Sequence, residues 1–324
     1  MTKLYRSLLY LSFIFLLSSC GSDHKEQKAN TKAKDKSEEE TPKERLNFDH
    51  IIGIRYTEVR RRFSNGLSFD KIGFQQEPSW ILEFQSNDTV KAYSPVKKRM
   101  LPFFLMYDHG DVYNFAKEYF RIKKATKDSL VFQRLQVDRK QIDNGVKSDV
   151  NMIFYADSYI KNILKTTPGE LQKPNSADTV FIRMLAEKSN QAPTDTSKTF
   201  AGRQPAQFIS TSPLMKVEKK STVDEFSGRT VAFDYLFPKY RIEIKKAYQD
   251  FAYDIKVIVD AQGNIHLVSF YNSLPELEES RRKIVKSIID IYLRNLLKIV
   301  PGTTLGIPHS SEINLVVVGK KAGK

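Results

Sequence analysis

The sequence predicts an α+β fold, in which a mostly antiparallel β domain, sandwich or barrel-like, precedes a C-terminal β-β-α-β domain. The first observation is a series of short runs rich in aromatic and β-branched residues, separated by turn residues, between about residues 50 and 160. The second is an amphipathic helical pattern that starts at Pro275, after two strand-like runs and before a third. With 40% hydrophobic residues, the chain can bury a core of ordinary size.

The chain begins with a segment that is typical of a cleaved export signal. Lys3 and Arg6 precede an uncharged run, Leu8 to Leu17, whose length of about ten residues suits a signal peptide. A membrane-spanning helix needs about twenty apolar residues. The run ends in Leu17-Ser18-Ser19-Cys20, which resembles the lipobox of bacterial lipoproteins. The resemblance implies that residues 1–19 are removed and that Cys20 carries a covalent lipid, including palmitate, as the only cofactor.

The residues after Cys20 predict where the protein is held. In bacterial lipoproteins an Asp directly after the lipid-bearing Cys is typical of retention in the inner membrane. This chain has Gly21 at that position. The resemblance therefore implies the outer membrane, on its periplasmic or its surface face. Residues 20–48 contain almost no apolar side chains and alternate in charge sign, which predicts a disordered tether.

The charge of the chain bears on its partners. The formal net charge is +14, which favours either contact with anionic lipid headgroups or simple solubility. Nucleic acid is not an expected partner of an exported protein. The single cysteine is the predicted lipid site, so no disulfide is expected to hold the fold.

Residues 49–165 are predicted to form the antiparallel β domain. The order of its strands faintly resembles that of lipocalin-like exported proteins, which implies a small apolar ligand inside the domain. Alternatively, its aromatic residues form an ordinary core; these are Trp80, Phe84, Phe104, Tyr119 and Phe132. The expected strands are residues 66–74, 80–84, 89–93, 119–123, 130–137 and 152–155.

One polar cluster in this domain, Asp108-His109-Gly110-Asp111, has the residue types of a metal site. No further ligand stands at a recognisable spacing, and the same residues are common in loops, so we expect a loop and no metal. The five histidines of the chain are scattered and none has a neighbouring nucleophile. We therefore expect no catalytic residue and no enzyme.

The remaining chain divides into a linker and a second domain. Residues 166–226 are predicted to be a mixed linker or insertion, with strands possible at 179–185 and 207–211. In the domain at 227–324, strands are expected at 253–259 and 265–271, around a turn that contains Gly263. A helix follows from Pro275, with acidic residues at its positive end, and residues 312–318 supply a third strand.

The landmarks of this second domain resemble the C-terminal domain of the TonB family. They are Val259-Asp260, Gly263, Pro275-Glu276-Leu277, Pro301-Gly302, Gly306 and Pro308. Two features depart from the family: Lys298-Ile299-Val300 stands where a Trp is usual, and Tyr248 to Phe251 replace the usual glycines. A lipid at Cys20 also replaces the membrane helix through which TonB is driven, so energy transduction is not expected.

The TonB resemblance implies a way of binding. In that family an edge strand pairs with a short segment of a partner protein, through main-chain hydrogen bonds and side-chain pockets. The candidate edge strand here is 312–318, with Glu312, Asn314, Val316 and Val318 as candidate binding residues. The same Val-rich strand would equally suit a buried core position.

Two functions follow from these observations. The first is a lipid-anchored binding or scaffold protein of the cell envelope that docks a protein segment through its TonB-like domain. The alternative is a lipocalin-like carrier or sensor of a small apolar ligand in the N-terminal β domain. A deep apolar cavity would favour the carrier, and a filled core with an exposed strand at 312–318 would favour docking.

Overall fold

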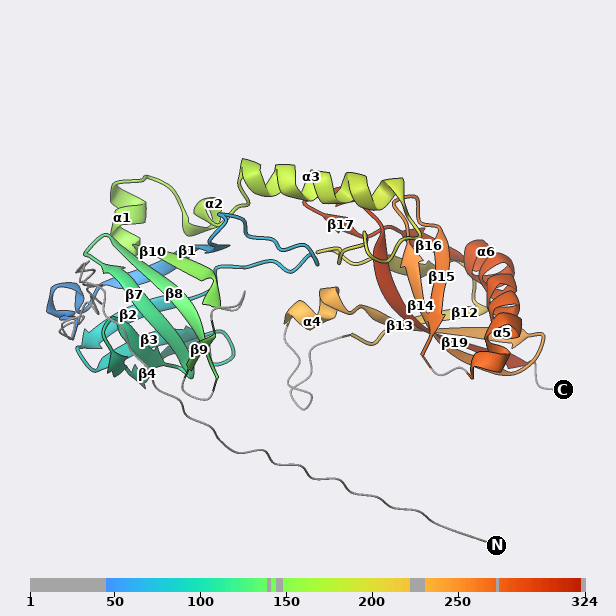
Figure 1. Cartoon of the computed structure of the whole chain (residues 1–324), viewed down its shortest axis with the longest axis horizontal. Helices are drawn as coiled ribbons and strands as arrows, with labels where there is room; N and C mark the ends of the chain where they lie inside the picture. The colour runs from blue at the N-terminus through green and yellow to red at the C-terminus, as the bar shows by residue number, and fades with distance from the viewer. Residues whose placement is uncertain (1–44, 139–140, 144–147, 222–230, 272–273, 322–324) are drawn as a thin grey trace, which may run out of the picture. The chain divides into compact units, whose positions relative to one another are not determined.

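The computed structural model describes residues 45–138, 141–143, 148–221, 231–271 and 274–321. The chain is mostly antiparallel β with few helices (Figure 1). The predicted signal peptide, most of the predicted tether and Cys20 lie outside the described residues. The prediction of a disordered tether is wrong for residues 46–48, because Phe48 is fully buried in the barrel core and the Leu46 N–H donates to the Tyr113 hydroxyl. Within the described part, no helix is both long and apolar enough to cross a membrane. The contacts of residues Pro42–Lys324 group them into one unit.

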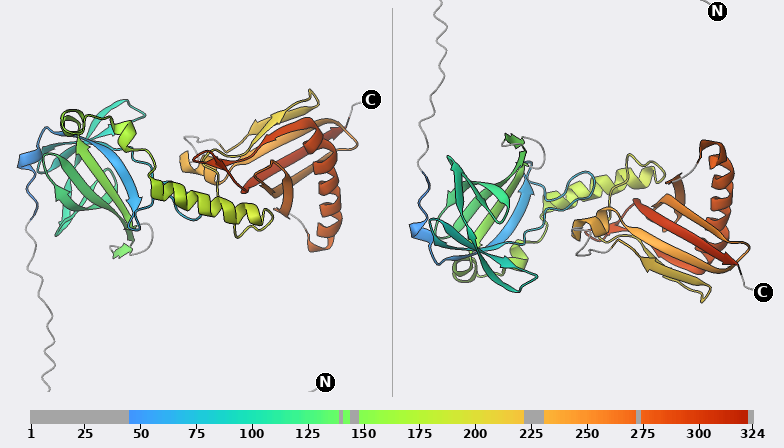
Figure 2. Two further views of the ribbon diagram at one scale, coloured as in Figure 1. Left: turned by 90° about the horizontal axis from the view of Figure 1, so that it is seen from above. Right: turned by 90° about the horizontal axis from the view of Figure 1, so that it is seen from below.

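Residues 55–156 form a ten-stranded sheet that curls into a nearly closed barrel (Figure 2). A 3-10 turn, Asp49–Ile51, precedes the sheet. Its order is β4-β3-β2-β1-β10-β8-β7-β6-β5, and β9 pairs with β8. The strands are β1 (Arg55–Phe63), β2 (Ile81–Ser86), β3 (Thr89–Ser94), β4 (Arg99–Phe104), β5 (Met106–His109), β6 (Val112–Phe115), β7 (Glu118–Ala125), β8 (Ser129–Asp138), β9 (Gln141–Asp143) and β10 (Val150–Ala156).

The two edges of this sheet meet at a corner. Strands β4 and β5 lie at opposite ends of the strand order, yet Leu105 alone joins them in the chain. Leu105 is buried, and its N–H donates to the carbonyl oxygen of Asp88 at 2.9 Å. The sheet therefore closes at this corner, while no strand of the described chain pairs with the free sides of β4 and β5.

Most strands predicted for this domain are confirmed as β2, β3, β7, β8 and β10, but the strand expected at 66–74 is wrong. That segment belongs to the long connection between β1 and β2. The Asp70 carboxylate accepts the N–H groups of Ile72 and Phe74, each at 2.9 Å, and Gly73 has a φ of 91°. Local side-chain hydrogen bonds and a positive φ thus produce a turn where the alternating pattern suggested a strand.

Aromatic side chains fill the interior of the barrel. Phe132 packs against Phe154 with ring centroids 5.2 Å apart, and Phe115 stacks on Phe120 at 4.6 Å. Of the five residues proposed as core, Phe84 and Phe132 are fully buried and Trp80 is half-buried. Phe104 is 81% exposed, so its assignment to the core is wrong. It lies on β4, an edge strand, and alternates with the inward-facing Phe103.

Short helices connect the barrel to the second half of the chain: α1 (Asp157–Asn162), α2 (Pro168–Leu171) and α3 (Ser176–Gln191). The strand expected at 179–185 is wrong, because these residues lie in α3. A capping box between Asn175 and Asp178 begins that helix. The buried Asp178 carboxylate also accepts from Arg62 at 2.9 Å and from the Ser68 N–H at 2.8 Å, which ties α3 to the β1–β2 connection.

A five-stranded sheet of order β12-β13-β19-β14-β15 forms the second half. Helix α5 continues through a π-helical turn, Ile289–Leu293, into α6, and it packs beside this sheet (Figures 1 and 2). The elements are β12 (Met215–Lys219), α4 (Val231–Leu236), β13 (Lys239–Ala247), β14 (Phe251–Val259), β15 (Ile265–Phe270), α5 (Pro275–Ile288), α6 (Arg294–Leu296) and β19 (Ser311–Lys321). Two small sheets pair β11 (Gln207–Ser210) with β16 (Leu297–Val300), and β17 (Thr303–Thr304) with β18 (Ile307–Pro308).

The strands expected at 207–211, 253–259, 265–271 and 312–318, and the helix from Pro275, are confirmed. The boundary expected between residues 226 and 227 does not match the pairing. Strand β12 belongs to the five-stranded sheet, and β11 pairs with β16. Residues 207–219 are therefore part of the C-terminal fold, because the strands that pair with β11 and β12 come later in the chain.

Candidate docking site

The predicted binding strand is not an edge. Strand β19 pairs with β13 in parallel on one side and with β14 in antiparallel on the other. From Asn314 onwards its main chain pairs with a strand on each side, so the prediction that residues 312–318 offer a free edge is wrong. The strand lies at the centre because β13 pairs with it. Residues 239–247 alternate polar and apolar side chains, but no strand was predicted there.

The four predicted residues share the half-exposed face of this central strand. Glu312, Asn314, Val316 and Val318 alternate with buried residues that pack with α5. Glu312 forms an ion pair with Lys256 at 3.0 Å, and Asn314 accepts a hydrogen bond from the Tyr271 hydroxyl. Val316 borders a hollow next to β14, and Glu312 borders a different one together with Phe200 and Phe237. Cys20 lies outside the described residues.

A free strand edge exists at the start of β14. The pairing of β15 with β14 begins at Ile255, so no described strand lies opposite residues 251–254 on that side. The Asp254 carbonyl accepts from the Tyr271 N–H at 3.0 Å, which shows that Asp254 points its main chain towards the β15 side. Ala252 is two residues away in the same antiparallel strand, so its N–H and C=O point the same way. Ala252 is exposed and these two groups have no strand partner within the described chain.

A hollow of about 490 Å³ surrounds this edge. Its aromatic side is a row formed by Phe251, Tyr253 and Phe270, with ring centroids 5.7 and 6.5 Å apart. Phe251 lies over Gly319 of the neighbouring strand, where a Cβ atom would come within 2.3 Å of the ring. Gly319 therefore leaves the space in which the Phe251 ring is held.

Charged groups stand on both sides of the same edge. Arg281 of α5 lines the hollow beside the aromatic row. Burial raises the pKa of the Tyr253 hydroxyl, and the nearby Arg281 charge opposes that rise. On the other side, Asp254 pairs with Lys239 at 3.5 Å through Oδ2, while its Oδ1 is buried with no hydrogen-bond partner in the described structure. The edge thus combines unpaired main-chain groups, aromatic surface and a cation.

The other polar clusters have structural partners. Asp108 and His109 form an exposed pair at 2.5 Å, and among the described residues no three potential ligands lie close enough to hold a metal ion. Asp260 pairs with His266 at 2.8 Å and accepts the N–H groups of Gln262 and Asn264, which shapes the β14–β15 turn. Burial raises the pKa of the Asp260 carboxyl, but these hydrogen bonds outweigh it and leave the pKa lowered.

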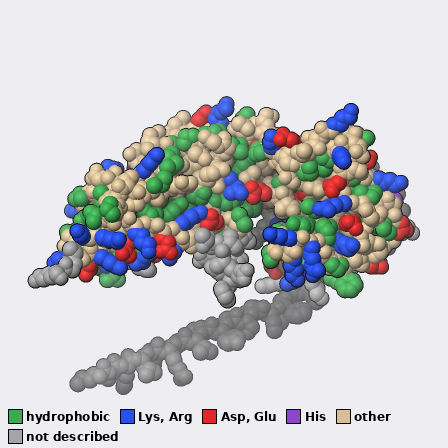
Figure 3. All heavy atoms as spheres, turned by 180° about the vertical axis from the view of Figure 1, so that it is seen from behind, with side chains coloured by type: hydrophobic (Ala, Val, Ile, Leu, Met, Phe, Trp, Pro, Cys, Tyr) green, Lys and Arg blue, Asp and Glu red, His purple; other side chains and the backbone are tan. Residues whose placement is uncertain are grey.

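The sequence contained one signal for this site. Tyr248 to Phe251 stand out as a departure from the TonB pattern, and Phe251 lines the hollow. No feature of the sequence singled out Ala252 or Arg281. A strand edge such as that at Ala252 depends on the absence of a neighbouring strand, which a local sequence pattern does not show. On the face drawn in Figure 3, Lys and Arg side chains are interspersed with Asp and Glu, as on a solvated surface.

No protein family matches this chain, and no curated protein is significantly similar to it.

Proposed function

We propose that this protein is a lipid-anchored protein of the cell envelope that binds an extended protein segment at the free edge of β14. The observation that carries the proposal is Ala252, whose unpaired main-chain N–H and C=O face the 490 Å³ hollow. A segment that adds a strand there forms hydrogen bonds with both groups. Each such bond contributes about 0.5–1.5 kcal/mol net.

Side chains on the two sides of the edge supply selectivity. Alternate residues of an added strand point to opposite faces of the sheet. One set meets the aromatic row of Phe251, Tyr253 and Phe270 beside Arg281, and the other meets Val316 and Asp254. The pattern favours a segment whose apolar residues cover the aromatic row.

A likeness to the TonB family remains part of this proposal. The order of β14, β15, α5 and β19 along the chain supports it, and so do the landmarks at Pro275-Glu276-Leu277 and Pro301-Gly302. Strand β13 already pairs with the side of β19 on which the resemblance would place a partner. We therefore place docking at β14, and we assign no catalytic or energy-transducing role.

Replacing Ala252 with proline tests the docking site. Proline lacks the N–H that points away from β19, and its ring obstructs an added strand, whereas the β14–β19 ladder does not use that N–H. Peptides of twelve random residues are selected by phage display on the purified full chain with Cys20→Ser. We expect the selected peptides to bind Ala252→Pro at least tenfold more weakly in fluorescence anisotropy titrations.

The matched control is Ala252→Val, which keeps the N–H and suits a strand. It should bind within threefold of the parent protein, and circular dichroism should show the same fold for both variants. Equal binding of the peptides to Ala252→Pro and to the parent would exclude strand addition at this edge.

Replacing Cys20 with serine tests the membrane anchor. Each buried methylene of an acyl chain contributes about 0.8 kcal/mol, so loss of the thiol that carries the lipid should release the protein from membranes. In bacterial cells fed radioactive palmitate, we expect label on the parent and on Ser22→Ala, but none on Cys20→Ser. Fractionation should move Cys20→Ser from the outer-membrane fraction to the soluble one. Palmitate incorporation into Cys20→Ser would contradict the assignment.

A further inference from the structure

A second hollow lies in the barrel, at the seam where the free sides of β4 and β5 leave the sheet open. On β4, Leu101 and Phe103 lie opposite Ala92 and Val90 of β3, both of which are buried. Leu101 and Phe103 therefore face inwards, yet they are only half-buried because none of the described strands covers the other side of β4. A pocket of about 340 Å³ opens at this place, between β4 and the β6–β7 turn. We call it the seam pocket.

Apolar side chains dominate the seam pocket. Its walls include Trp80, Leu101, Phe103, Pro95 and Ala116. Its volume is near the lower end of the range for small-molecule sites, about 300–1,000 Å³. Below it, Trp80 meets the rings of Phe115 and Phe120 edge to face, each with centroids 5.6 Å apart. The interior beneath is filled, so the pocket is a shallow mouth and not the deep cavity expected of a lipocalin-like carrier.

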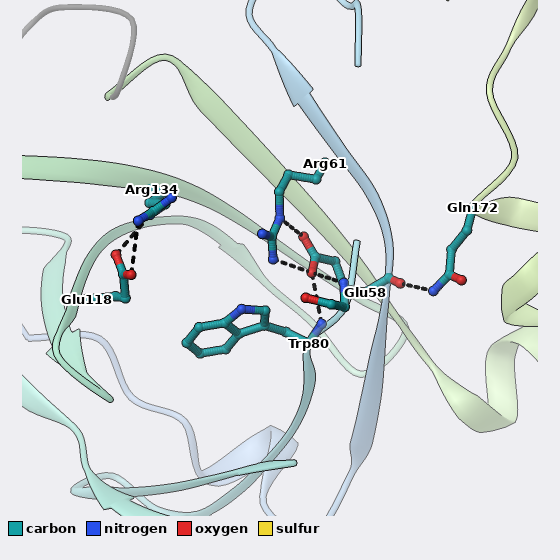
Figure 4. Close-up of polar contacts among 7 residues, drawn as sticks. Glu58, Arg61, Trp80, Glu118, Arg134 and Gln172 are labelled. Atoms are coloured by element: carbon teal, nitrogen blue, oxygen red, sulfur yellow. Dashed lines mark hydrogen bonds and ion pairs between the residues drawn. The ribbon is translucent and has the colours of Figure 1, made fainter. Parts of the chain in front are cut away.

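A buried carboxylate fixes the main chain at Trp80 (Figure 4). Glu58 on β1 is fully buried, and its Oε2 accepts the N–H groups of Ser79 at 2.8 Å and Trp80 at 3.0 Å. Arg61 donates to both oxygens of the same carboxylate, at 2.8 and 2.7 Å. These hydrogen bonds fix the main chain of Trp80, and its ring packs on two Phe rings. The indole is therefore already in position before a ligand binds.

The pocket presents no unpaired charge. Glu118 is the charged residue among its lining residues, and Arg134 donates to both of its oxygens at 2.8 and 2.9 Å (Figure 4). A charged ligand would lose hydration without gaining a counter-charge. The chemistry of the pocket therefore suits an uncharged, apolar molecule.

The turn that closes one wall is strained. Ala116 and Lys117 connect β6 to β7 and have φ values of 51° and 66°. A two-residue hairpin turn with two positive φ values normally contains Asn-Gly or a similar pair. Non-glycine residues in this conformation are strained, and such strain concentrates at ligand sites. Here it sets the Ala116 methyl group into the pocket wall.

From this geometry we propose that the seam pocket binds a small, uncharged, apolar molecule against Trp80. This site lies on the barrel sheet, not on the sheet that contains β14, so it is a second binding activity and does not depend on segment docking. The pocket accepts such a molecule through burial of apolar surface, at about 25 cal/mol per Å² removed from water.

The chain contains a single tryptophan, so all tryptophan emission comes from the wall of this pocket. The full-length protein is titrated with N-phenyl-1-naphthylamine, an uncharged apolar dye that accepts excitation energy from tryptophan. We expect a saturable, one-to-one loss of Trp80 emission. Anilinonaphthalene sulfonate, an anionic dye of similar shape, should bind at least tenfold more weakly by the same measure.

Two variants locate the binding. Leu101→Arg places a charge in the pocket wall and should weaken binding of the uncharged dye at least tenfold. Val96→Arg is the matched control, because Val96 is 89% exposed nearby and does not line the pocket. Unchanged Trp80 emission at saturating dye, equal binding of the anionic dye, or equal effects of the two variants would each overturn the proposal. The dye comparison decides the question if Leu101→Arg does not fold.

Discussion

Replacing Arg61 with methionine should lower the free energy of unfolding by about 3–5 kcal/mol, the largest effect expected of any single change described for this protein. Arg61 is the only cation that pairs with Glu58 in the described structure, and the Glu58 side chain is 0% exposed. Methionine replaces the aliphatic part of the arginine side chain but leaves the carboxylate with only the N–H groups of Ser79 and Trp80. Urea denaturation followed by Trp80 emission measures the change.

The double variant Glu58→Gln with Arg61→Met separates the buried charge from lost packing. If the uncompensated charge causes the loss of stability, removing that charge should restore at least half of the stability lost in Arg61→Met. An exposed pair provides the comparison: Lys283 and Glu279 are 77% and 85% exposed, so Lys283→Met should cost less than about 1 kcal/mol. A double variant as unstable as the sum of its two single variants would contradict this explanation.

Protein stability should fall by about 3 kcal/mol between pH 6.5 and pH 4 because of one histidine. Burial lowers the pKa of His309 from 6.5 to about 4, while the Ser310 carbonyl opposes the shift. The ring stacks on Phe200 with centroids 3.6 Å apart, and its nitrogens contact Thr304 at 3.1 Å and Ser310 at 3.2 Å. The folded state therefore keeps the imidazole neutral.

The direction of this pH dependence follows from the lowered pKa of His309. Above pH 6.5 the ring is neutral in both states and its contribution to stability is complete. Between pH 6.5 and 4 the unfolded chain binds a proton that the folded chain does not, so stability declines, and below pH 4 the decline stops. Each pKa unit corresponds to about 1.4 kcal/mol. Chemical denaturation at pH 7.5, 5.5 and 4 should show this progression.

The variant His309→Gln isolates this effect from the carboxyl groups. Hydrogen bonds outweigh burial and lower the pKa values of Asp178 and Asp260, so their stabilisation is lost only below their ordinary pKa of 3.8. Burial raises the pKa of Asp70, which favours the folded state as pH falls. His309→Gln should be less stable at pH 7.5 but should lose little further stability down to pH 4. The same decline in both proteins would show that other groups cause it.

Local patterns predicted the elements well where one face of a strand packs on a core. In β8 and β10 the alternation of apolar and polar residues reflects burial against the barrel interior, and both strands lie where expected. Strands were wrongly predicted at 66–74, where Asp70 forms a local turn, and at 179–185, which lie in α3. In the second case the Asn175 and Asp178 capping residues were readable in the sequence and outweigh the β-branched content.

Edges could not be predicted in the same way. An alternating strand such as β19 has the same sequence pattern whether it has one neighbour or two, because main-chain pairing leaves no mark on side-chain type. Its central place depends on β13, more than sixty residues earlier. The free edge at Ala252 likewise depends on where β15 stops. These are properties of strand pairing across the chain, and a single sequence pattern does not contain them.

The central place of β19 also governs the order of assembly. Among the described strands, β19 comes last in the chain, yet both β13 and β14 require it as a neighbour. Until residues 311–321 are available, the earlier strands can form only two separate hairpins, β12–β13 and β14–β15. During synthesis this half of the protein therefore stays incomplete until that segment has left the ribosome.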